Sequence, residues 1–252
     1  MSRKEMAYMP YLCIGDPDRE TSIELAKELC KSADLIEIGI PFSDPIADGP
    51  VLHAAATRAL KAGMTTGKAF ECIKEIRSST RIPIVVMTYA NIALNPSITS
   101  FVKNLSLSGA DGILLPDLPI EEAAEMKKSA RENGLATIFM ATPGTSDARL
   151  KRILDATEGY VYLTAVEGTT GARQRLDSRV ADTIKRARRI SDIPVAVGFG
   201  ISGREQAKAM KSAGADGAIV GSRIAELYAA AGKEDAIKKV REFSIGIKQA
   251  CF

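Results

Sequence analysis

The chain has 252 residues, of which 46% are apolar and 26% are charged, a composition typical of a folded globular protein. A net charge of +3 is too balanced to indicate a nucleic acid partner. No apolar stretch approaches the roughly 18 residues that a membrane span needs. The first eight residues also lack the apolar region of a signal peptide, so a cytoplasmic protein without membrane association is expected.

Short apolar runs of β-forming residues alternate with longer helical patterns along the whole chain. The predicted strands are Tyr8–Ile14, Asp34–Ile38, Ile82–Thr88, Gly112–Leu115, Leu135–Met140, Tyr160–Thr164, Pro194–Val197 and Gly217–Val220. The predicted helices include Arg19–Lys31, Thr66–Ser78, Ser97–Ser108, Ile120–Asn133, Ser146–Thr157, Ser178–Ile190, Gly203–Ser212 and Lys233–Lys248. This alternation predicts an α/β fold with a parallel sheet, and the repeated units favour one (β/α)8 TIM barrel over residues 1–252.

The second predicted strand carries the first candidate catalytic residue. Glu37 lies within an apolar strand, where alternation places it on the opposite face from Ile36 and Ile38. Glu37 then points into the mouth of the barrel, where loss of water raises a carboxyl pKa and suits acid–base catalysis. The strand position alone leaves a second interpretation open, in which a buried lysine or arginine neutralises a structural glutamate.

The loop after this strand supplies two more carboxylates, Asp44 and Asp48, on a segment stiffened by three prolines. One carboxylate could donate a proton while another stabilises positive charge on the substrate. Aspartates in loops also form turns and cap helices, and that alternative stays open from the residues alone.

Glycine-rich loops follow the last two predicted strands, at residues 198–202 and 221–222. The second loop leads into a predicted short helix, Arg223–Ala231. Barrels of this kind commonly bind phosphate at the loops after strands 7 and 8, through backbone N–H groups and the N-terminus of a short helix. Residues 168–171 could close a third side of this phosphate site, although ordinary turn chemistry is the alternative for each glycine.

The sequence lacks the residue patterns that metal sites, nucleotide-binding sites and serine nucleophiles need. The four cysteines form no CxxC pair, and the single histidine, His53, has no partner cysteine, so no metal site is predicted. The sequence also lacks a P-loop, a dinucleotide-binding fingerprint and a GxSxG elbow. Carboxylates remain as the catalytic candidates.

Residues 35–50, LIEIGIPFSDPIADGP, closely resemble the signature of the tryptophan synthase α-subunit family. The resemblance extends over nearly the whole chain and includes the segments at residues 15–17, 89–91, 116–119, 168–171, 198–202 and 221–222. It implies retro-aldol cleavage of indole-3-glycerol phosphate to indole and glyceraldehyde 3-phosphate, in tryptophan biosynthesis. It also implies an α2β2 complex in which the β subunit carries pyridoxal phosphate and the α subunit needs no cofactor or metal.

The resemblance assigns roles to individual positions. Glu37 is implied as the general acid–base group and Asp48 as the group that binds the indole N–H. The implied indole side of the substrate pocket includes Tyr11, Met87 and Tyr162. The implied phosphate side includes Thr170, Gly171, Gly200, Gly221 and Ser222. Asp44 and Thr170 match positions linked to loop closure and to signalling with the β subunit.

One departure from the family pattern motivates an alternative. The family usually has a serine and then an arginine after strand six, where this chain has Ala165 and Val166. The rival hypothesis is a catalytically weak phosphate-binding barrel that serves mainly to activate a β partner. A second rival is a related barrel that acts on another sugar-phosphate conjugate, and the retained Glu37 and Asp48 argue against both.

Overall fold

A computed structural model describes residues 5–164, 178–198, 200–229 and 231–252. In these ranges one sheet has the strand order β5-β4-β3-β2-β1-β9-β8-β7-β6, and its paired strands are parallel. The strands are β1 (Ala7–Cys13), β2 (Ile36–Gly39), β3 (Ile84–Met87), β4 (Gly112–Leu114), β5 (Ala136–Ile138), β6 (Met140–Ala141), β7 (Val161–Thr164), β8 (Val195–Gly198) and β9 (Gly217–Val220).

The sheet closes through one short segment of chain. β5 pairs with β4 on one side, and β6 pairs with β7 on the other. Phe139 separates β5 from β6, and its carbonyl accepts a 3.0 Å hydrogen bond from the Tyr162 N–H. The predicted single strand Leu135–Met140 is therefore present as two short strands that occupy one place in the barrel. The (β/α)8 fold class is confirmed.

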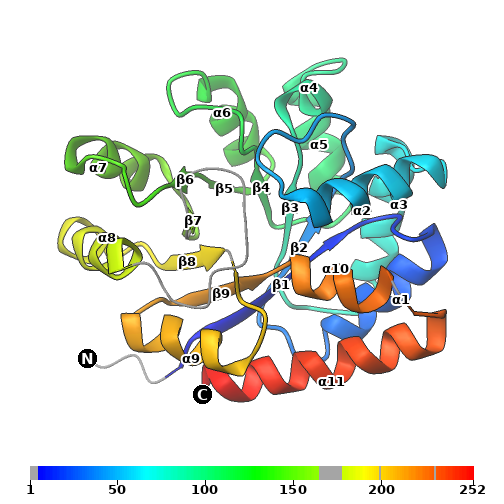
Figure 1. The fold of residues 1–252 in the computed structure, drawn as a ribbon. Coiled ribbons are helices and arrows are strands. Elements are labelled where there is room, and N and C mark those ends of the chain that lie inside the picture. The colour runs from blue at the N-terminus through cyan, green and yellow to red at the C-terminus, as the bar shows by residue number, and fades with distance from the viewer. Residues whose placement is uncertain (1–4, 165–177, 199, 230) are drawn as a thin grey trace.

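Helices surround the barrel in Figure 1. They are α1 (Arg19–Leu29), α2 (Pro50–Lys61), α3 (Thr66–Arg77), α4 (Ala90–Ala93), α5 (Ile98–Leu107), α6 (Ala124–Glu132), α7 (Asp147–Ala156), α8 (Ser178–Ile190), α9 (Arg204–Ala213), α10 (Ser222–Ala229) and α11 (Lys233–Cys251). Several of them begin where the sequence provides a capping side chain. Asp18, Thr65, Ser97 and Ser146 each accept a hydrogen bond from the backbone N–H three residues later.

Most helix boundaries differ from the sequence prediction by one or two residues, and the larger differences in α6 and α11 have local reasons. α6 begins at Ala124 rather than at Ile120, because the Glu122 N–H closes a turn onto the Pro119 carbonyl at 3.0 Å. α11 continues past Lys248 to Cys251, whose carbonyl accepts a 3.0 Å hydrogen bond from the Met6 N–H. The end of the last helix is thereby tied to the start of the first strand.

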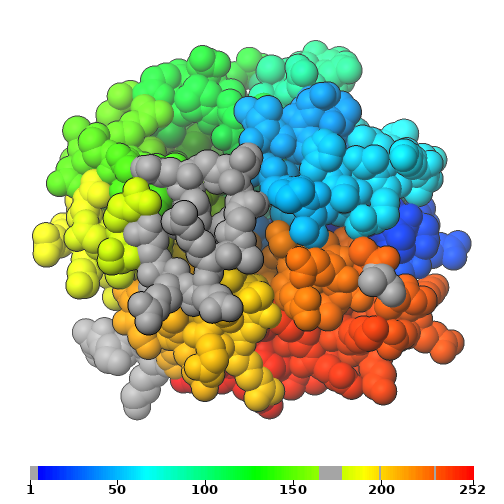
Figure 2. Space-filling view, in the orientation of Figure 1, coloured from blue at the N-terminus to red at the C-terminus, as the bar shows by residue number. Residues whose placement is uncertain are grey.

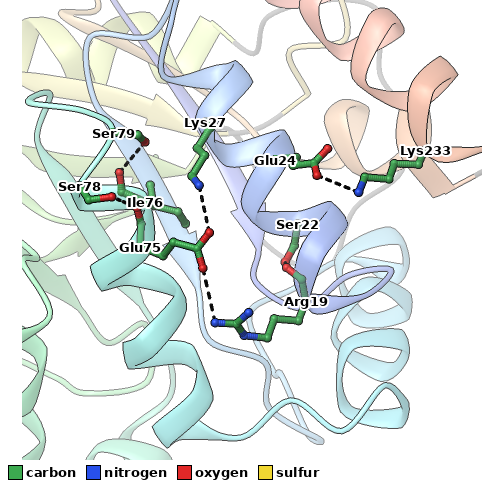
Figure 3. Close-up of polar contacts among 9 residues, drawn as sticks. All are labelled: Arg19, Ser22, Glu24, Lys27, Glu75, Ile76, Ser78, Ser79 and Lys233. Carbon is green, nitrogen blue, oxygen red and sulfur yellow. Dashed lines mark hydrogen bonds and ion pairs between the residues drawn. The ribbon is translucent and has the colours of Figure 1, made fainter.

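Polar contacts fix α1 to the helices on both of its sides (Figure 3). Glu75 of α3 accepts from Lys27 at 3.0 Å and from Arg19 at 3.5 Å, and Lys233 of α11 pairs with Glu24 at 2.8 Å. Ser22 accepts a 2.9 Å hydrogen bond from the Gly15 N–H, which ties α1 to the loop after β1. α1 thus holds one of the loops at the carboxyl ends of the strands.

The apolar core lies inside the barrel and between the barrel and its helices. Because neighbours in paired strands share a face, Tyr11, Glu37, Val85 and Gly112 form one lateral row. Met87 and Gly39 pair in a row nearer the carboxyl ends. None of the helices in the described part of the chain combines the length and apolar character of a membrane span.

Candidate active site

Glu37 lies in the barrel interior, as the alternation of β2 predicts. Its side chain is 1% exposed, and its Oε1 accepts a hydrogen bond from the Tyr160 hydroxyl on the far side of the barrel. Its Oε2 has no hydrogen-bond partner among the described residues. Burial raises the pKa of Glu37 to about 7, against a smaller lowering by the Tyr160 hydrogen bond.

This geometry bears on the two interpretations that the strand position left open. No described lysine or arginine forms an ion pair with Glu37, so it is not the structural half of a buried salt bridge in that part of the chain. A carboxyl group with a pKa of about 7 can donate a proton and accept one near neutral pH. The free Oε2 is the atom from which such a transfer can proceed.

Tyr160 is a site residue that the sequence reasoning missed. It immediately precedes β7 and is buried, and burial followed by the Glu37 charge raises its pKa well above the usual range for tyrosine. Alternation along the strand gives the signal that could have found it, since Tyr160 shares a face with Tyr162. Its pairing with a carboxylate 123 positions earlier is a property of the closed barrel.

Two of the predicted pocket tyrosines lie over glycines of the neighbouring strand. A Cβ at Gly39 would overlap the Tyr11 hydroxyl, and a Cβ at Gly198 would overlap the Tyr162 hydroxyl. Burial is the main reason that the pKa of Tyr162 is raised, and the charges of Glu37 and Asp48 raise it further. The charges of both predicted catalytic carboxylates therefore act on the Tyr162 hydroxyl.

Asp48 is half-buried in the loop between β2 and α2. Burial raises its pKa to about 6, and a hydrogen bond with the Tyr89 hydroxyl and the charge of His53 oppose that rise. The Tyr89 hydroxyl also accepts a 3.2 Å hydrogen bond from the Ala47 N–H, and its ring packs 5.3 Å from the Phe42 ring, centroid to centroid. Tyr89 is thus a second missed residue, and it holds the loop that carries Asp48.

The other predicted pocket and loop residues occupy different environments. Met87 is buried beside Gly39, at the end of β3, whereas Asp44 is exposed and accepts a hydrogen bond from the Ser43 hydroxyl. The structure therefore brings Met87 to the tyrosine pocket and leaves Asp44 on the surface of the loop.

The phosphate candidates lie at the ends of β8 and β9. Ser222 is the first residue of α10, and Gly221 lies against the Tyr11 ring, where a Cβ would come within 3.1 Å of the ring carbon Cδ1. Gly200 has a φ of +68°, a left-handed conformation that favours glycine. Thr170 and Gly171 lie outside the described residues, as do Ala165, Val166 and the rest of residues 168–171.

A second buried carboxylate, Asp16, lies in the loop after β1. It is fully buried, and its two oxygens accept hydrogen bonds of 2.7 Å each from Nε and Nη2 of Arg58 on α2. A bidentate ion pair of this kind fixes the orientation of both groups and ties the loop after β1 to α2. Sequence reasoning missed this pair because its members are 42 positions apart in different elements.

The arrangement supplies carboxyl and phenol groups from the described residues. Within the described ranges, no three histidine, cysteine, aspartate or glutamate side chains gather in a way that could hold a metal ion. The site brings together a buried carboxyl with a pKa of about 7, a second carboxyl on the adjoining loop, several tyrosines and the N-terminus of α10.

Comparison with known proteins identifies the family. The model of the "Tryptophan synthase alpha chain" family matches residues 1–251. The tryptophan synthase alpha chains of Gloeobacter violaceus and Pyrococcus furiosus are each 43% identical, over 99% and 97% of this chain and 91% and 99% of their own lengths.

A solved structure of the tryptophan synthase α2β2 complex from Pyrococcus furiosus gives a TM-score of 0.91 at 41% identity, covering 96% of this chain and 98% of that chain. A structure of the tryptophan synthase A-subunit from the same organism gives a TM-score of 0.90 at 40% identity. The expected resemblance is confirmed, and the chain belongs to the tryptophan synthase alpha chain family.

Proposed function

We propose that this chain cleaves indole-3-glycerol phosphate to indole and glyceraldehyde 3-phosphate, as the α subunit of a cytoplasmic tryptophan synthase. Family membership supports the activity, and the observation that carries the mechanism is the buried Glu37 carboxyl at the barrel mouth, whose Oε2 has no hydrogen-bond partner among the described residues. The alpha chain carries no cofactor of its own, since pyridoxal phosphate belongs to the β subunit. An α2β2 assembly like that solved for the Pyrococcus furiosus relative is the expected form.

Cleavage begins with protonation of indole C3. Protonated Glu37 donates its proton to C3, and the ring nitrogen becomes positively charged. Asp48 accepts a hydrogen bond from the ring N–H and stabilises that charge. Its place beside Tyr89 on a packed loop supports this role.

The second step breaks the carbon–carbon bond. The Glu37 carboxylate takes the proton from the side-chain hydroxyl, the bond between C3 and the hydroxyl-bearing carbon breaks, and its electron pair returns to the ring. The products are indole and an aldehyde, and Glu37 regains its proton. One carboxyl can perform both transfers because a pKa of about 7 disfavours neither form strongly near neutral pH.

The remaining predicted residues are proposed to bind the substrate. Tyr11, Met87 and Tyr162 line the indole pocket, and the glycines beside the two tyrosines give their hydroxyl groups room. Gly171, Gly200, Gly221 and Ser222 hold the phosphate with Thr170, and the N-terminus of α10 attracts the anion. Asp44 and Thr170 are proposed to take part in loop closure and signalling to the β subunit, and the exposure of Asp44 is compatible with that role.

An assay of indole release tests the function. Purified protein is incubated with indole-3-glycerol phosphate, with and without a β subunit. Slow release by the chain alone and faster release with the β subunit are expected. Release only in trace amounts, together with strong activation of the β reaction, would favour the rival binding subunit that the Ala165 and Val166 positions suggest. A folded protein that releases no indole in either condition would contradict the lyase proposal.

A further inference from the structure

α7 and α8 are neighbouring helices on the outside of the barrel, as Figure 1 shows, and they carry a surplus of positive charge. Together they hold eight lysines and arginines but only three aspartates. The surplus of five positive charges exceeds the net charge of +3 of the whole chain, so the positive charge is concentrated on this face. The same green and yellow segments adjoin at the left of Figure 2.

An open groove of about 350 Å³ lies between these two helices. Its volume is at the lower end of the range for sites that bind small molecules. Three cationic side chains and one carboxylate line the groove, together with two apolar side chains. The lining residues are Asp147, Ala148 and Lys151 of α7 and Arg186, Arg189 and Ile190 of α8. The groove therefore combines positive charge with an apolar surface.

The one carboxylate in the groove is already paired with a cation. Asp147 accepts a 2.6 Å hydrogen bond from Arg186 Nε, and Arg186 Nη2 donates to the Thr145 carbonyl at 2.5 Å. These two bonds hold the Arg186 side chain, which is 21% exposed, against the start of α7. Asp147 and Arg186 thus neutralise each other and form one wall of the groove.

The other two cations of the groove are not neutralised in this way. Lys151 pairs at 2.7 Å with Asp155, which lies four residues further along α7, and both side chains are exposed to solvent. An exposed pair at this spacing contributes little free energy, so the Lys151 ammonium is available to a ligand. Arg189 is exposed and forms no hydrogen bond or ion pair with another described residue. Two positive charges therefore face the groove.

This combination defines the chemistry of a ligand. A phosphomonoester carries nearly two negative charges at neutral pH, which matches the two available cations. The Lys151 ammonium binds phosphate as a point charge, whereas the Arg189 guanidinium can bind phosphate with two parallel N–H groups or stack on an aromatic ring. Ala148 and Ile190 offer contact to an apolar part of the ligand, which inorganic phosphate does not have.

We propose that the groove between α7 and α8 binds a phosphomonoester with an aromatic part, such as a nucleoside monophosphate, through Lys151 and Arg189. The groove lies between helices on the outside of the barrel, whereas Glu37 lies in the interior. The inference goes beyond the proposed function and does not depend on it.

The test uses adenosine monophosphate as the probe and the full chain at low ionic strength. The double variant Lys151→Gln with Arg189→Gln removes both available charges. The matched control, Lys238→Gln with Lys239→Gln, removes two charges from α11, where Lys239 pairs at 2.6 Å with Asp235, also four residues away. Calorimetry gives the Kd of adenosine monophosphate, adenosine and inorganic phosphate, and indole release gives kcat and KM.

Wild-type protein is expected to bind adenosine monophosphate saturably, and the groove variant should raise the Kd about tenfold or more through the loss of two charge-assisted contacts. Each single substitution should raise the Kd about threefold. The control should stay within about twofold of wild type, and added salt should weaken binding. Adenosine and inorganic phosphate should each bind more weakly than adenosine monophosphate, and kcat and KM should not change in either double variant.

The inference is overturned if wild-type protein shows no saturable binding of adenosine monophosphate, or if the groove variant and the control weaken binding equally. Equal affinity for inorganic phosphate or for adenosine would contradict the proposed class of ligand. Tighter binding of a single-stranded oligonucleotide, lost in the groove variant, would point to an extended polyanion instead.

The two proposals fail separately in these measurements. Turnover of indole-3-glycerol phosphate without binding of adenosine monophosphate defeats this inference and leaves the proposed function standing. Binding of adenosine monophosphate that depends on Lys151 and Arg189, in a protein without turnover, does the reverse.

Discussion

Glu37 and Asp16 are equally buried carboxylates near the mouth of the barrel, yet their surroundings differ. Both oxygens of Asp16 accept hydrogen bonds from the Arg58 guanidinium. Glu37 accepts one hydrogen bond from the neutral Tyr160 phenol, and its other oxygen has no partner among the described residues. The Arg58 guanidinium places a cation against both oxygens of Asp16. Burial raises the pKa of Glu37 to about 7, and no described cation pairs with that carboxyl. Two carboxyl groups of similar burial thus differ in whether a cation faces them.

The largest effect that this comparison predicts is the loss of turnover in Glu37→Gln. Glutamine keeps the shape but cannot transfer a proton, so kcat should fall by about 10²–10⁴ while substrate binding persists. The control is Glu28→Gln, at a buried glutamate paired with Arg241, which should lose stability and keep kcat. Steady-state indole release and calorimetric unfolding give both readouts, and equal kcat values for the two variants would contradict the role of Glu37.

Asp48→Asn tests the second carboxylate. Without its negative charge, the cationic ring that forms on C3 protonation is less stable, and kcat should fall by about 10². Asp155→Asn makes the same change at an exposed pair with Lys151 and should leave kcat at its wild-type value. A fall in kcat of less than about threefold would remove Asp48 from the mechanism.

Arg58→Met would leave the buried Asp16 carboxyl without its cationic partner, as Glu37 is among the described residues. An unpaired charge would remain buried, so the free energy of unfolding should drop by about 3 kcal/mol, the lower end for a buried pair because Arg58 itself is partly exposed. Denaturant unfolding at neutral pH measures this drop. A change below about 0.5 kcal/mol would show that the pair does not anchor the loop after β1 to α2.

The smallest effect concerns Tyr160, which stabilises the ionised form of Glu37. The Tyr160 hydrogen bond lowers the Glu37 pKa, so Tyr160→Phe should raise it. Glu37 must be protonated to donate a proton to C3, so activity declines as pH rises through the pKa of Glu37. In the variant, the midpoint of this decline should move to higher pH by less than about one pH unit. A pH–rate profile that does not move, or moves to lower pH, would contradict this assignment.

The sequence predicted the barrel and the inward direction of Glu37, because both follow from local periodicity. It also predicted the short helix after β9, present as Ser222–Ala229. It did not predict the hydrogen bond from Tyr160 to Glu37, the hydrogen bond between Tyr89 and Asp48, or the ion pair of Arg58 with Asp16. These contacts join elements that are distant in the sequence. The break at Phe139 likewise reflects barrel closure, where one segment must pair with strands on both sides.

Direct titration of the Glu37 carboxyl tests the central claim. Infrared spectra of the wild-type protein, minus those of Glu37→Gln, are recorded from pH 4 to pH 9 to follow the protonated carboxyl band. The account predicts a midpoint near pH 7, with the band lost as pH rises. A midpoint near 4.5, the ordinary value for glutamate, would show that Glu37 is charged at neutral pH and would contradict its role as the proton donor.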